Sequence, residues 1–182
     1  MTKTQKITRT ALLIAILFVI QYFKNISAYI SGPIVNTILL IATFYIGIPS
    51  GILLSIIAPV SSYFIAGGAA MTFLMTQTKF TALPIIIIGN IIYVVLSAVI
   101  YNKKNNLSLI VGLTASSILK WLFMFLSADF IIRPLFEESL GEKIAILGKI
   151  FGTLQLYAAI VGSIIFYLIF KIITKESTSR SI

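Results

Sequence analysis

The sequence predicts an all-α integral membrane protein with six transmembrane helices. Hydrophobic residues make up 59% of its 182 positions, charged residues make up only 10%, and the mean hydropathy is +1.07. These values lie far from those of soluble globular domains. The apolar runs do not alternate with polar residues, so they favour helices, which satisfy every backbone polar group within the bilayer, over a β-barrel. We expect residues 1–182 to form a single transmembrane domain.

The six predicted helices follow the apolar runs along the chain. We place them at about residues 7–23, 33–48, 52–66, 83–101, 107–128 and 146–173. The first run has the length of a signal peptide, but no small-residue cleavage site follows it, so we interpret it as a retained helix. Pro33 suits the first turn of the second helix, and GIPSG at 47–51 breaks the chain and restarts it with almost no loop. Each of the two helices in this hairpin has roughly 15 residues, near the lower limit of about 17 for crossing a bilayer.

The predicted connections differ in character. Residues 67–82 are semi-apolar and should fold back over the helices, and the glycines at 67 and 68 either hinge a lid or cap the preceding helix. NKKNN at 102–106 is a polar turn, and 129–143 is the most charged loop, with four of the five acidic residues. An even number of helices places both termini on one side. That side holds eight basic residues against five on the other, so the positive-inside rule predicts cytoplasmic termini.

Composition also excludes several functions. The net charge of +9 comes from basic residues at helix ends, which fits topology signals and contact with anionic lipid rather than nucleic-acid binding. Cysteine and histidine are absent, which excludes disulfides, thiol chemistry, imidazole bases and the usual zinc sites. Every acid lies in a loop or the tail, whereas membrane transferases need paired aspartates for Mg²⁺. We therefore predict no enzyme, no catalytic residue, no metal site and no cofactor.

A few polar side chains inside the apolar runs suggest a binding site, because such groups are costly unless they face protein or a cavity. Helix geometry places four of them at one depth, in the half of the bundle remote from the termini: Asn36, Asn90, Lys120 and Gln155. Tyr93 and Trp121 accompany them by helical spacing, and Lys79 in the third loop is a further candidate. We predict that these residues converge on one outward-opening, substrate-binding pocket.

Other interpretations of these residues remain open from the sequence alone. The amides of Asn36, Asn90 and Gln155 could instead bond neighbouring helices to one another. Lys120 could extend to the interface or pair with Asp129, and the aromatic residues could serve packing alone. Small residues four apart, as at Ala11 and Ala15 in ALLIA, mark a helix contact, either within the chain or with a partner.

Taken together, these features resemble the substrate-binding S component of an energy-coupling factor (ECF) vitamin transporter. The resemblance rests on the length, six helices with termini inside, ALLIA in helix one, Gly32-Pro33-x-x-Asn36 at the second helix, and the very short turn before a proline-bearing third helix. It spans the whole chain without a strict motif and without a close match to one subtype.

The resemblance implies a multi-pass protein of a prokaryotic plasma membrane that captures a vitamin-like substrate outside the cell. It implies that Ala11 and Ala15 contact a transmembrane coupling subunit, and that two ATPase subunits complete the complex. The chain itself has no G-x-x-x-x-G-K-[ST] run, so ATP-driven work must come from these partners.

The charge of the predicted pocket then narrows the chemical class of the substrate. Lys120, joined by Lys79 or Arg133, in a pocket without helical acids suits a carboxylate or phosphate, as in niacin, pantothenate, biotin or folates, better than a thiamine-like cation. The competing hypothesis is a small stand-alone permease or an assembly subunit of a membrane complex.

Overall fold

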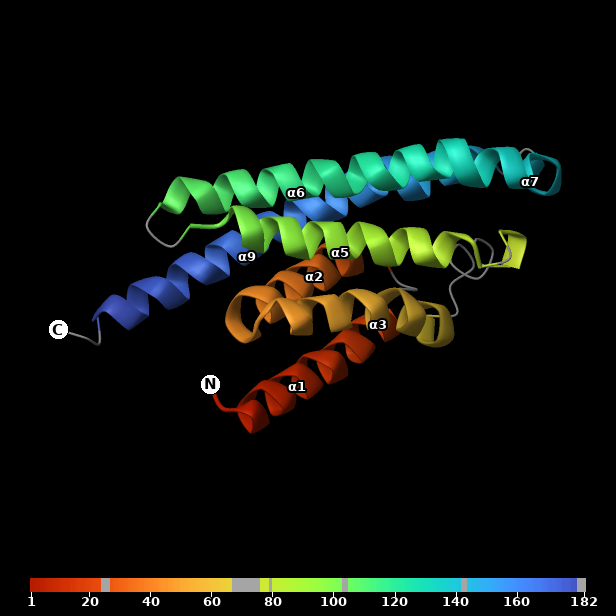
Figure 1. The fold of residues 1–182 in the computed structure, drawn as a ribbon. Helices are drawn as coiled ribbons and strands as arrows, with labels where there is room; N and C mark the ends of the chain where they lie inside the picture. The colour runs from red at the N-terminus through yellow and green to blue at the C-terminus, as the bar shows by residue number, and fades with distance from the viewer. Residues whose placement is uncertain (24–26, 67–75, 79, 103–104, 142–143, 180–182) are drawn as a thin grey trace.

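A computed structural model describes the chain except for residues 24–26, 67–75, 79, 103–104, 142–143 and 180–182, and its described part contains helices and no strand (Figure 1). Six helical stretches are long and apolar enough to cross a membrane, which confirms the predicted fold class. The elements in chain order are α1 (Lys3–Tyr22), α2 (Ala28–Ile41), η2 (Ala42–Ile46), α3 (Ile48–Ala66), α5 (Ala82–Ile100), α6 (Asn106–Ser127), η3 (Ala128–Ile132), α7 (Arg133–Leu140), α8 (Ile144–Leu147), η5 (Gly148–Thr153) and α9 (Leu154–Ser179), where η marks a wider π-helical stretch.

The hairpin of α2 and α3 is longer than its apolar runs suggested. The stretch from Ala28 to Ile46 and the helix α3 each have 19 residues, which is enough to span the bilayer. The turn between them is Gly47 alone, whose φ of 138° lies in the region that favours glycine. Pro33 lies inside α2 rather than in its first turn, because the helix already starts after Ser27. The proline therefore costs α2 one backbone hydrogen bond near its beginning without ending it.

The first helix also starts earlier than predicted, because a capping box precedes it. The Thr2 side chain accepts a hydrogen bond from the backbone N–H of Gln5 at 3.2 Å, and the Gln5 side chain accepts one from the Thr2 N–H at 3.0 Å. This reciprocal pair satisfies two N–H groups that a helix start leaves unpaired. The polar segment before the first apolar run is therefore helical from Lys3.

The prediction of a loop at 129–143 is wrong over most of that segment, which is helical. The fifth span continues through η3 and α7 as far as Leu140. Arg133 Nη1 pairs with Asp129 Oδ1 at 3.1 Å, four residues apart on this helix, and Pro134 lies in the first turn of α7, where its missing N–H is harmless. Charge density thus suggested a loop where charged residues occupy the exposed side of an extended helix.

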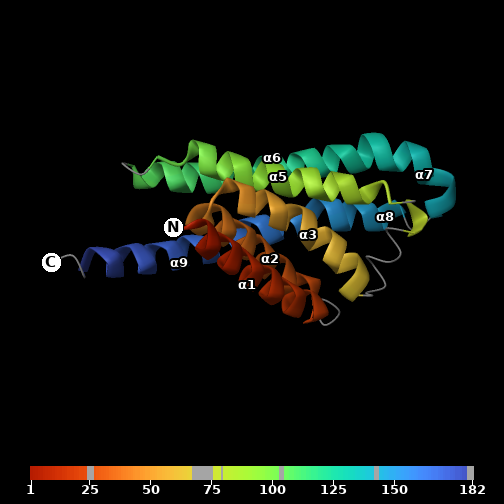
Figure 2. The same cartoon turned by 60° about the horizontal axis from the view of Figure 1, so that its bottom comes forward.

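The helices pack as a bundle in which both termini lie at the same end (Figures 1 and 2). α5 packs against α6 and α3, α9 packs against α2 and α6, and α1 packs mainly on α3 at the edge of the bundle. The shared end agrees with an even number of spans. The assignment of that end to the cytoplasm stays a prediction.

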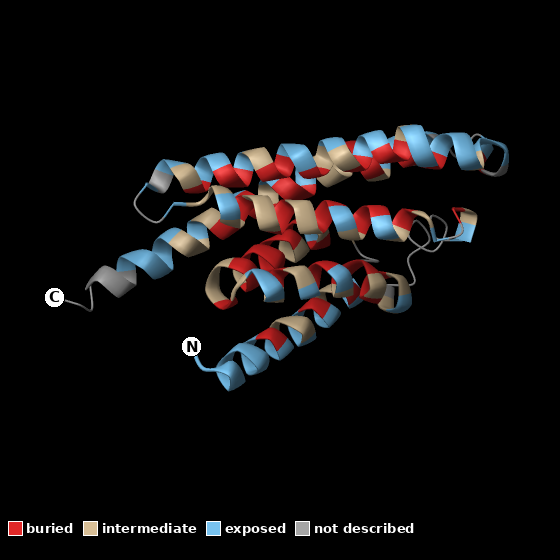
Figure 3. Ribbon diagram, viewed as in Figure 1, coloured by how far each residue is buried: buried red, intermediate tan, exposed pale blue. Residues whose placement is uncertain are grey.

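Two buried apolar clusters form the core, seen as red bands where the helices face one another in Figure 3. The larger one centres on α2 and includes Leu39, Leu54 and Phe166. The second joins the start of α5 to the end of α6 and to η5, through residues such as Ile86, Met124 and Phe151. Polar residues lie where these clusters separate, and that is where the cavity opens.

Candidate functional site

A cavity of about 140 Å³ lies between the two clusters and is walled by every membrane-spanning segment. The lining residues lie near the middle of the bundle or in the part of it that is remote from the termini. They comprise Gln21, Ala28, Ser31, Gly32, Val35, Asn36, Ala58, Pro59, Ser62, Ile86, Asn90, Lys120, Ile150, Leu154, Gln155 and Ala158. The cavity therefore lies in the region that the sequence predicted for the binding site.

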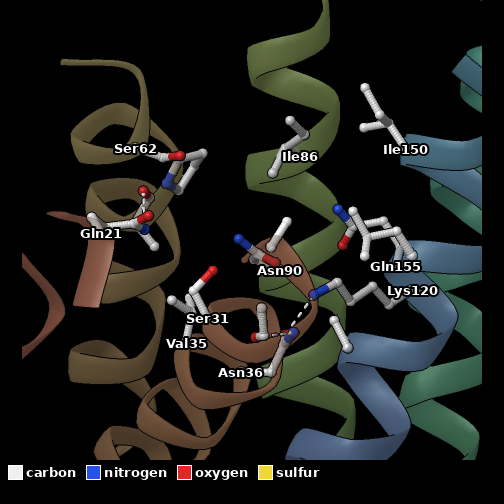
Figure 4. A pocket seen from close by; sticks show the side chains of 16 residues that line it. Gln21, Ser31, Val35, Asn36, Ser62, Ile86, Asn90, Lys120, Ile150 and Gln155 are labelled. Carbon is white, nitrogen blue, oxygen red and sulfur yellow. Dashed lines mark hydrogen bonds between the residues drawn. The ribbon is translucent and has the colours of Figure 1, made fainter. Parts of the chain in front are cut away.

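Lys120 is the charged group of this cavity, and its side chain is only 1% exposed (Figure 4). Its Nζ donates a hydrogen bond to Asn36 Oδ1 at 2.6 Å and lies 5.1 Å from the centre of the Tyr93 ring. Asn36 Nδ2 in turn donates to the Gly32 carbonyl at 3.1 Å, which fixes the amide with its oxygen toward the lysine. The ammonium has three donors, so these contacts leave it able to bond a ligand.

Glycines let the helices approach closely enough to build this arrangement. A Cβ on Gly162 of α9 would lie 2.7 Å from Asn36 Cβ and 2.8 Å from the Pro33 carbonyl oxygen on α2. Thr37 Oγ1 donates to the Gly162 carbonyl at 3.0 Å and ties the same two helices together. Because Gly162 has no side chain to hold α2 away from α9, α2 lies close enough to the centre of the bundle for Asn36 to reach Lys120 on α6.

Tyr93 packs against Lys120 and is itself fully buried. Its hydroxyl donates to the Ala159 carbonyl at 3.2 Å and lies 2.8 Å from Ser163 Oγ, which lies 3.1 Å from Ser117 Oγ. This network joins α5, α6 and α9 and fixes the ring against the ammonium. Tyr93 is not among the residues that line the cavity, so its contact with the site is through Lys120.

Two further predicted residues bring amides to the cavity. Asn90 is buried and Gln155 is half-buried, and both line the wall near Lys120 (Figure 4). Within the described part of the chain neither side-chain amide has a hydrogen-bond partner. Each offers both a donor and an acceptor to a bound molecule. The alternative that these two amides bond neighbouring helices is therefore not what the structure shows.

The remaining candidates predicted from the sequence lie elsewhere. Trp121 is half-buried and stacks on Phe125, with ring centres 5.9 Å apart, outside the cavity lining. Asp129 pairs with Arg133, so the alternative pairing of Asp129 with Lys120 does not form. Lys79 and the glycines at 67 and 68 fall outside the described residues.

One wall of the cavity, formed by Gln21, Ser31 and Ser62, was not predicted from the sequence. Gln21 Nε2 donates to the Ala58 carbonyl at 3.0 Å, and Gln21 is 2% exposed. A signal was present, because Gln21 is the only amide in the apolar run of the first helix.

The lining thus combines one buried cation with neutral amides and hydroxyls, and it includes no carboxylate among the described residues. No cluster of three or more residues able to hold a metal ion occurs in the same part of the chain. Such a lining can bind a polar organic molecule by charge-assisted and neutral hydrogen bonds.

Comparison with known proteins identifies the family of the chain. A family model described as ECF transporter, substrate-specific component, matches residues 5–174. Neither curated proteins nor solved structures give a match. Because the family model covers nearly the whole chain, the protein belongs to the substrate-specific components of ECF transporters.

Proposed function

We propose that this chain captures a small organic micronutrient with an anionic group in the cavity at Lys120, for uptake by an ECF importer in the cell membrane. As a substrate-specific component it is a transport subunit rather than an enzyme. The carboxylate or phosphate of the ligand would bond Lys120, and the amides of Asn90 and Gln155 would bond its polar groups. A vitamin of the kind that the sequence suggests meets this description.

The observation that carries this proposal is the unbalanced charge of Lys120. Burying an ammonium is costly unless it is paired, and the described cavity lining holds no acid that could pair with it. Asn36 and the Tyr93 ring stabilise the cation only in part. An anionic ligand would supply the missing charge, whereas a cationic ligand would add a second unpaired one.

The volume of the cavity favours a small ligand. Its size of about 140 Å³ is below the roughly 300 Å³ at which pockets for drug-sized molecules begin. Acids of the size of nicotinate, pantothenate or biotin suit it better than a folate, of which only a part would be enclosed.

The test is to identify what the purified protein carries and whether Lys120 holds it. Cells are grown with mixed vitamins, the protein is purified in mild detergent, and the small molecules released on denaturation are identified by mass spectrometry. Lys120→Met keeps an unbranched side chain that is one atom shorter and removes the charge. Lys149→Met is the matched control, since Lys149 is exposed at the same end of the bundle and does not line the cavity.

We expect an anionic compound from the parent and from Lys149→Met, and none from Lys120→Met. Titration of that compound should show an affinity loss of about 10-fold to 100-fold for Lys120→Met, since a hydrogen bond to a charged group contributes about 1.5–3 kcal/mol. Unchanged affinity in Lys120→Met would remove Lys120 from the site. An empty parent protein that also binds no vitamin in titration would contradict the capture function.

The partners implied by this function are a transmembrane coupling subunit and two ATPase subunits. The sequence holds no phosphate-binding loop of its own, so the energy must come from such partners. We propose Ala11 and Ala15 as the contact for the coupling subunit. Their support is that both are exposed on α1, of which only 17% is buried within the chain.

A further inference from the structure

Gln21 forms the wall of the cavity that faces Lys120 from the other side (Figure 4). It comes from the end of α1, whereas Lys120 comes from α6. Gln21 is 2% exposed and has no charged neighbour in the described lining apart from Lys120. The two ends of the cavity therefore present different chemistry.

The orientation of the Gln21 amide is fixed by its hydrogen bond. The Ala58 carbonyl can only accept, so the group facing it at 3.0 Å must be the NH₂ of Gln21. The carbonyl oxygen Oε1 therefore lies on the other side of the amide. Oε1 is buried and has no hydrogen-bond partner in the described part of the protein.

Ser31, on the same wall, adds to this acceptor character. Its hydroxyl donates to the Ser27 carbonyl at 3.0 Å, so its proton is already used and its oxygen can serve as an acceptor. The opposite side holds the Lys120 ammonium together with the amides of Asn90 and Gln155, each of which offers both a donor and an acceptor. The cavity thus has its cation on α6 and, on α1, an acceptor that lacks a partner among the described residues.

We infer that the ligand is bipolar, with its anionic group at Lys120 and a neutral N–H or O–H donor at the other end that bonds Gln21 Oε1. This inference rests on the proposed function and narrows its substrate class. A neutral donor is favoured over an ammonium because, among the described residues, no carboxylate lines that end to balance a second cation. Acids with a remote amide, ureide, amine or hydroxyl group fit, and acids that lack any donor do not.

A purely structural role for Gln21 makes a different prediction. A buried carbonyl without a partner destabilises the ligand-free protein, whereas the bond from Gln21 Nε2 to the Ala58 carbonyl stabilises it. Ser61 Oγ also donates to the Ala58 carbonyl, at 3.0 Å, so that carbonyl stays bonded when Gln21 is replaced, and an apolar side chain of similar size should be about as stable there. If Gln21 instead serves stability alone, replacing it with an apolar side chain should lower the melting temperature of the ligand-free protein. Gln21→Leu therefore separates the two roles by whether it lowers that melting temperature.

The experiment measures thermal stability and binding for the full chain in detergent. The probes with a remote donor are pantothenate, biotin and 4-aminobenzoate, and the donor-free probes are nicotinate, benzoate and lipoate. Thr10→Val is the matched control, because Thr10 Oγ1 and Ser50 Oγ also form a side-chain bond between α1 and α3, at 3.0 Å, away from the cavity. Gln21→Met is a second apolar variant in case Gln21→Leu does not fold.

We expect the parent protein to bind at least one donor-bearing acid ten times or more tighter than every donor-free acid. Gln21→Leu should lose about tenfold in affinity for that acid, as expected for one hydrogen bond to a buried group, with no drop in its ligand-free melting temperature. Thr10→Val should keep the affinity and lower the melting temperature.

Two outcomes would overturn the inference while leaving the proposed function in place. One is a donor-free acid that binds as tightly as the best donor-bearing acid, with Lys120→Met still abolishing its binding. The other is unchanged affinity for the donor-bearing acid in both Gln21→Leu and Gln21→Met. Absence of binding by the parent for any acid, together with no released compound, would overturn the proposed function as well.

Discussion

The contact between Lys120 and Tyr93 shows how a single residue can act on a site that it does not line. The ammonium lies 5.1 Å from the ring centre, while the Tyr93 hydroxyl bonds α9 on the far side. A cation over an aromatic face is stabilised by about 0.5–2 kcal/mol, depending on burial. The ring and the hydroxyl therefore have separable roles, one in holding the cation and one in joining helices.

Tyr93→Phe should thus keep ligand affinity within about threefold of the parent, because the ring remains, and should lower stability by about 1 kcal/mol through loss of the hydroxyl bonds. Tyr93→Leu should lose affinity further, by roughly 3-fold to 30-fold. Titration of the co-purified compound and thermal melting check both values. Equal affinity losses in the two variants would mean that the hydroxyl, rather than the ring, acts on the site.

For single residues, the sequence predicted the site from polar side chains in apolar runs, because such side chains are costly there. Asn36, Asn90, Lys120 and Gln155 stood out for that reason, and the structure brings them together. Trp121 was grouped with the site by helical spacing, but it follows Lys120 directly, and successive helical residues point about 100° apart, so its ring lies outside the cavity lining and stacks on Phe125. Spacing along one helix does not show which face of that helix lines the cavity.

At the scale of helices, the packing of α2 on α9 sets the position of Asn36. A Cβ on Gly162 would meet Asn36 Cβ and two backbone atoms of α2, the Pro33 carbonyl oxygen at 2.8 Å and the Thr37 amide nitrogen at 3.3 Å, which cannot rotate away. Any added side chain must therefore push the two helices apart. Asn36 would then move relative to Lys120.

Gly162→Ala should destabilise the protein by about 1–3 kcal/mol, the usual cost of overpacking, and should weaken ligand binding through the displaced Asn36. Gly148→Ala is the control, since a Cβ there meets nothing within 4 Å. Thermal melting and ligand titration of both variants provide the comparison. A Gly162→Ala protein that melts and binds like the parent would show that α2 and α9 can separate without moving the site.

The sequence predicted the presence of each helix better than the residues at which it begins and ends, because local features of the sequence misplaced those ends. Charge placed a loop where η3 and α7 extend the fifth span, and the proline rule started α2 too late. The π-helical stretch η5 also widens the turn between Lys149 and Gln155. Ordinary helical spacing of three residues would group Lys149, Gly152 and Gln155, whereas Lys149 is exposed and Gln155 lines the cavity.

For the molecule as a whole, hydropathy was sufficient for the number of spans, because a bilayer admits few alternatives to apolar helices. The depth of the site followed from counting residues along those helices. The amide of Gln21 in an apolar run marked it as unusual, but its place in the wall opposite Lys120 depends on how α1 packs on α3, which that local signal does not give. Specificity is therefore a property of the assembled bundle.

The outer face of α1 offers a contact surface beyond the single chain. Thr10, Leu17 and Gln21 are the buried residues of α1, whereas Ala11 and Ala15 are exposed on the same helix. α1 lies at the edge of the bundle (Figures 1 and 2). Small residues four apart let another helix approach closely. One helix would then bind the ligand on its inner face and the coupling subunit on its outer face.

Ala15→Trp should therefore reduce co-purification of the coupling subunit at least tenfold when both are co-expressed, because the bulky ring separates the helix backbones. Ligand affinity should not change, since Ala15 does not line the cavity. Val99→Trp is the control, at a position of α5 that is 67% exposed. Quantitative immunoblotting of the purified complex gives the ratio of subunits. If Ala15→Trp retains the coupling subunit as well as Val99→Trp does, the partner docks on another face, and the exposed alanines of α1 face lipid alone.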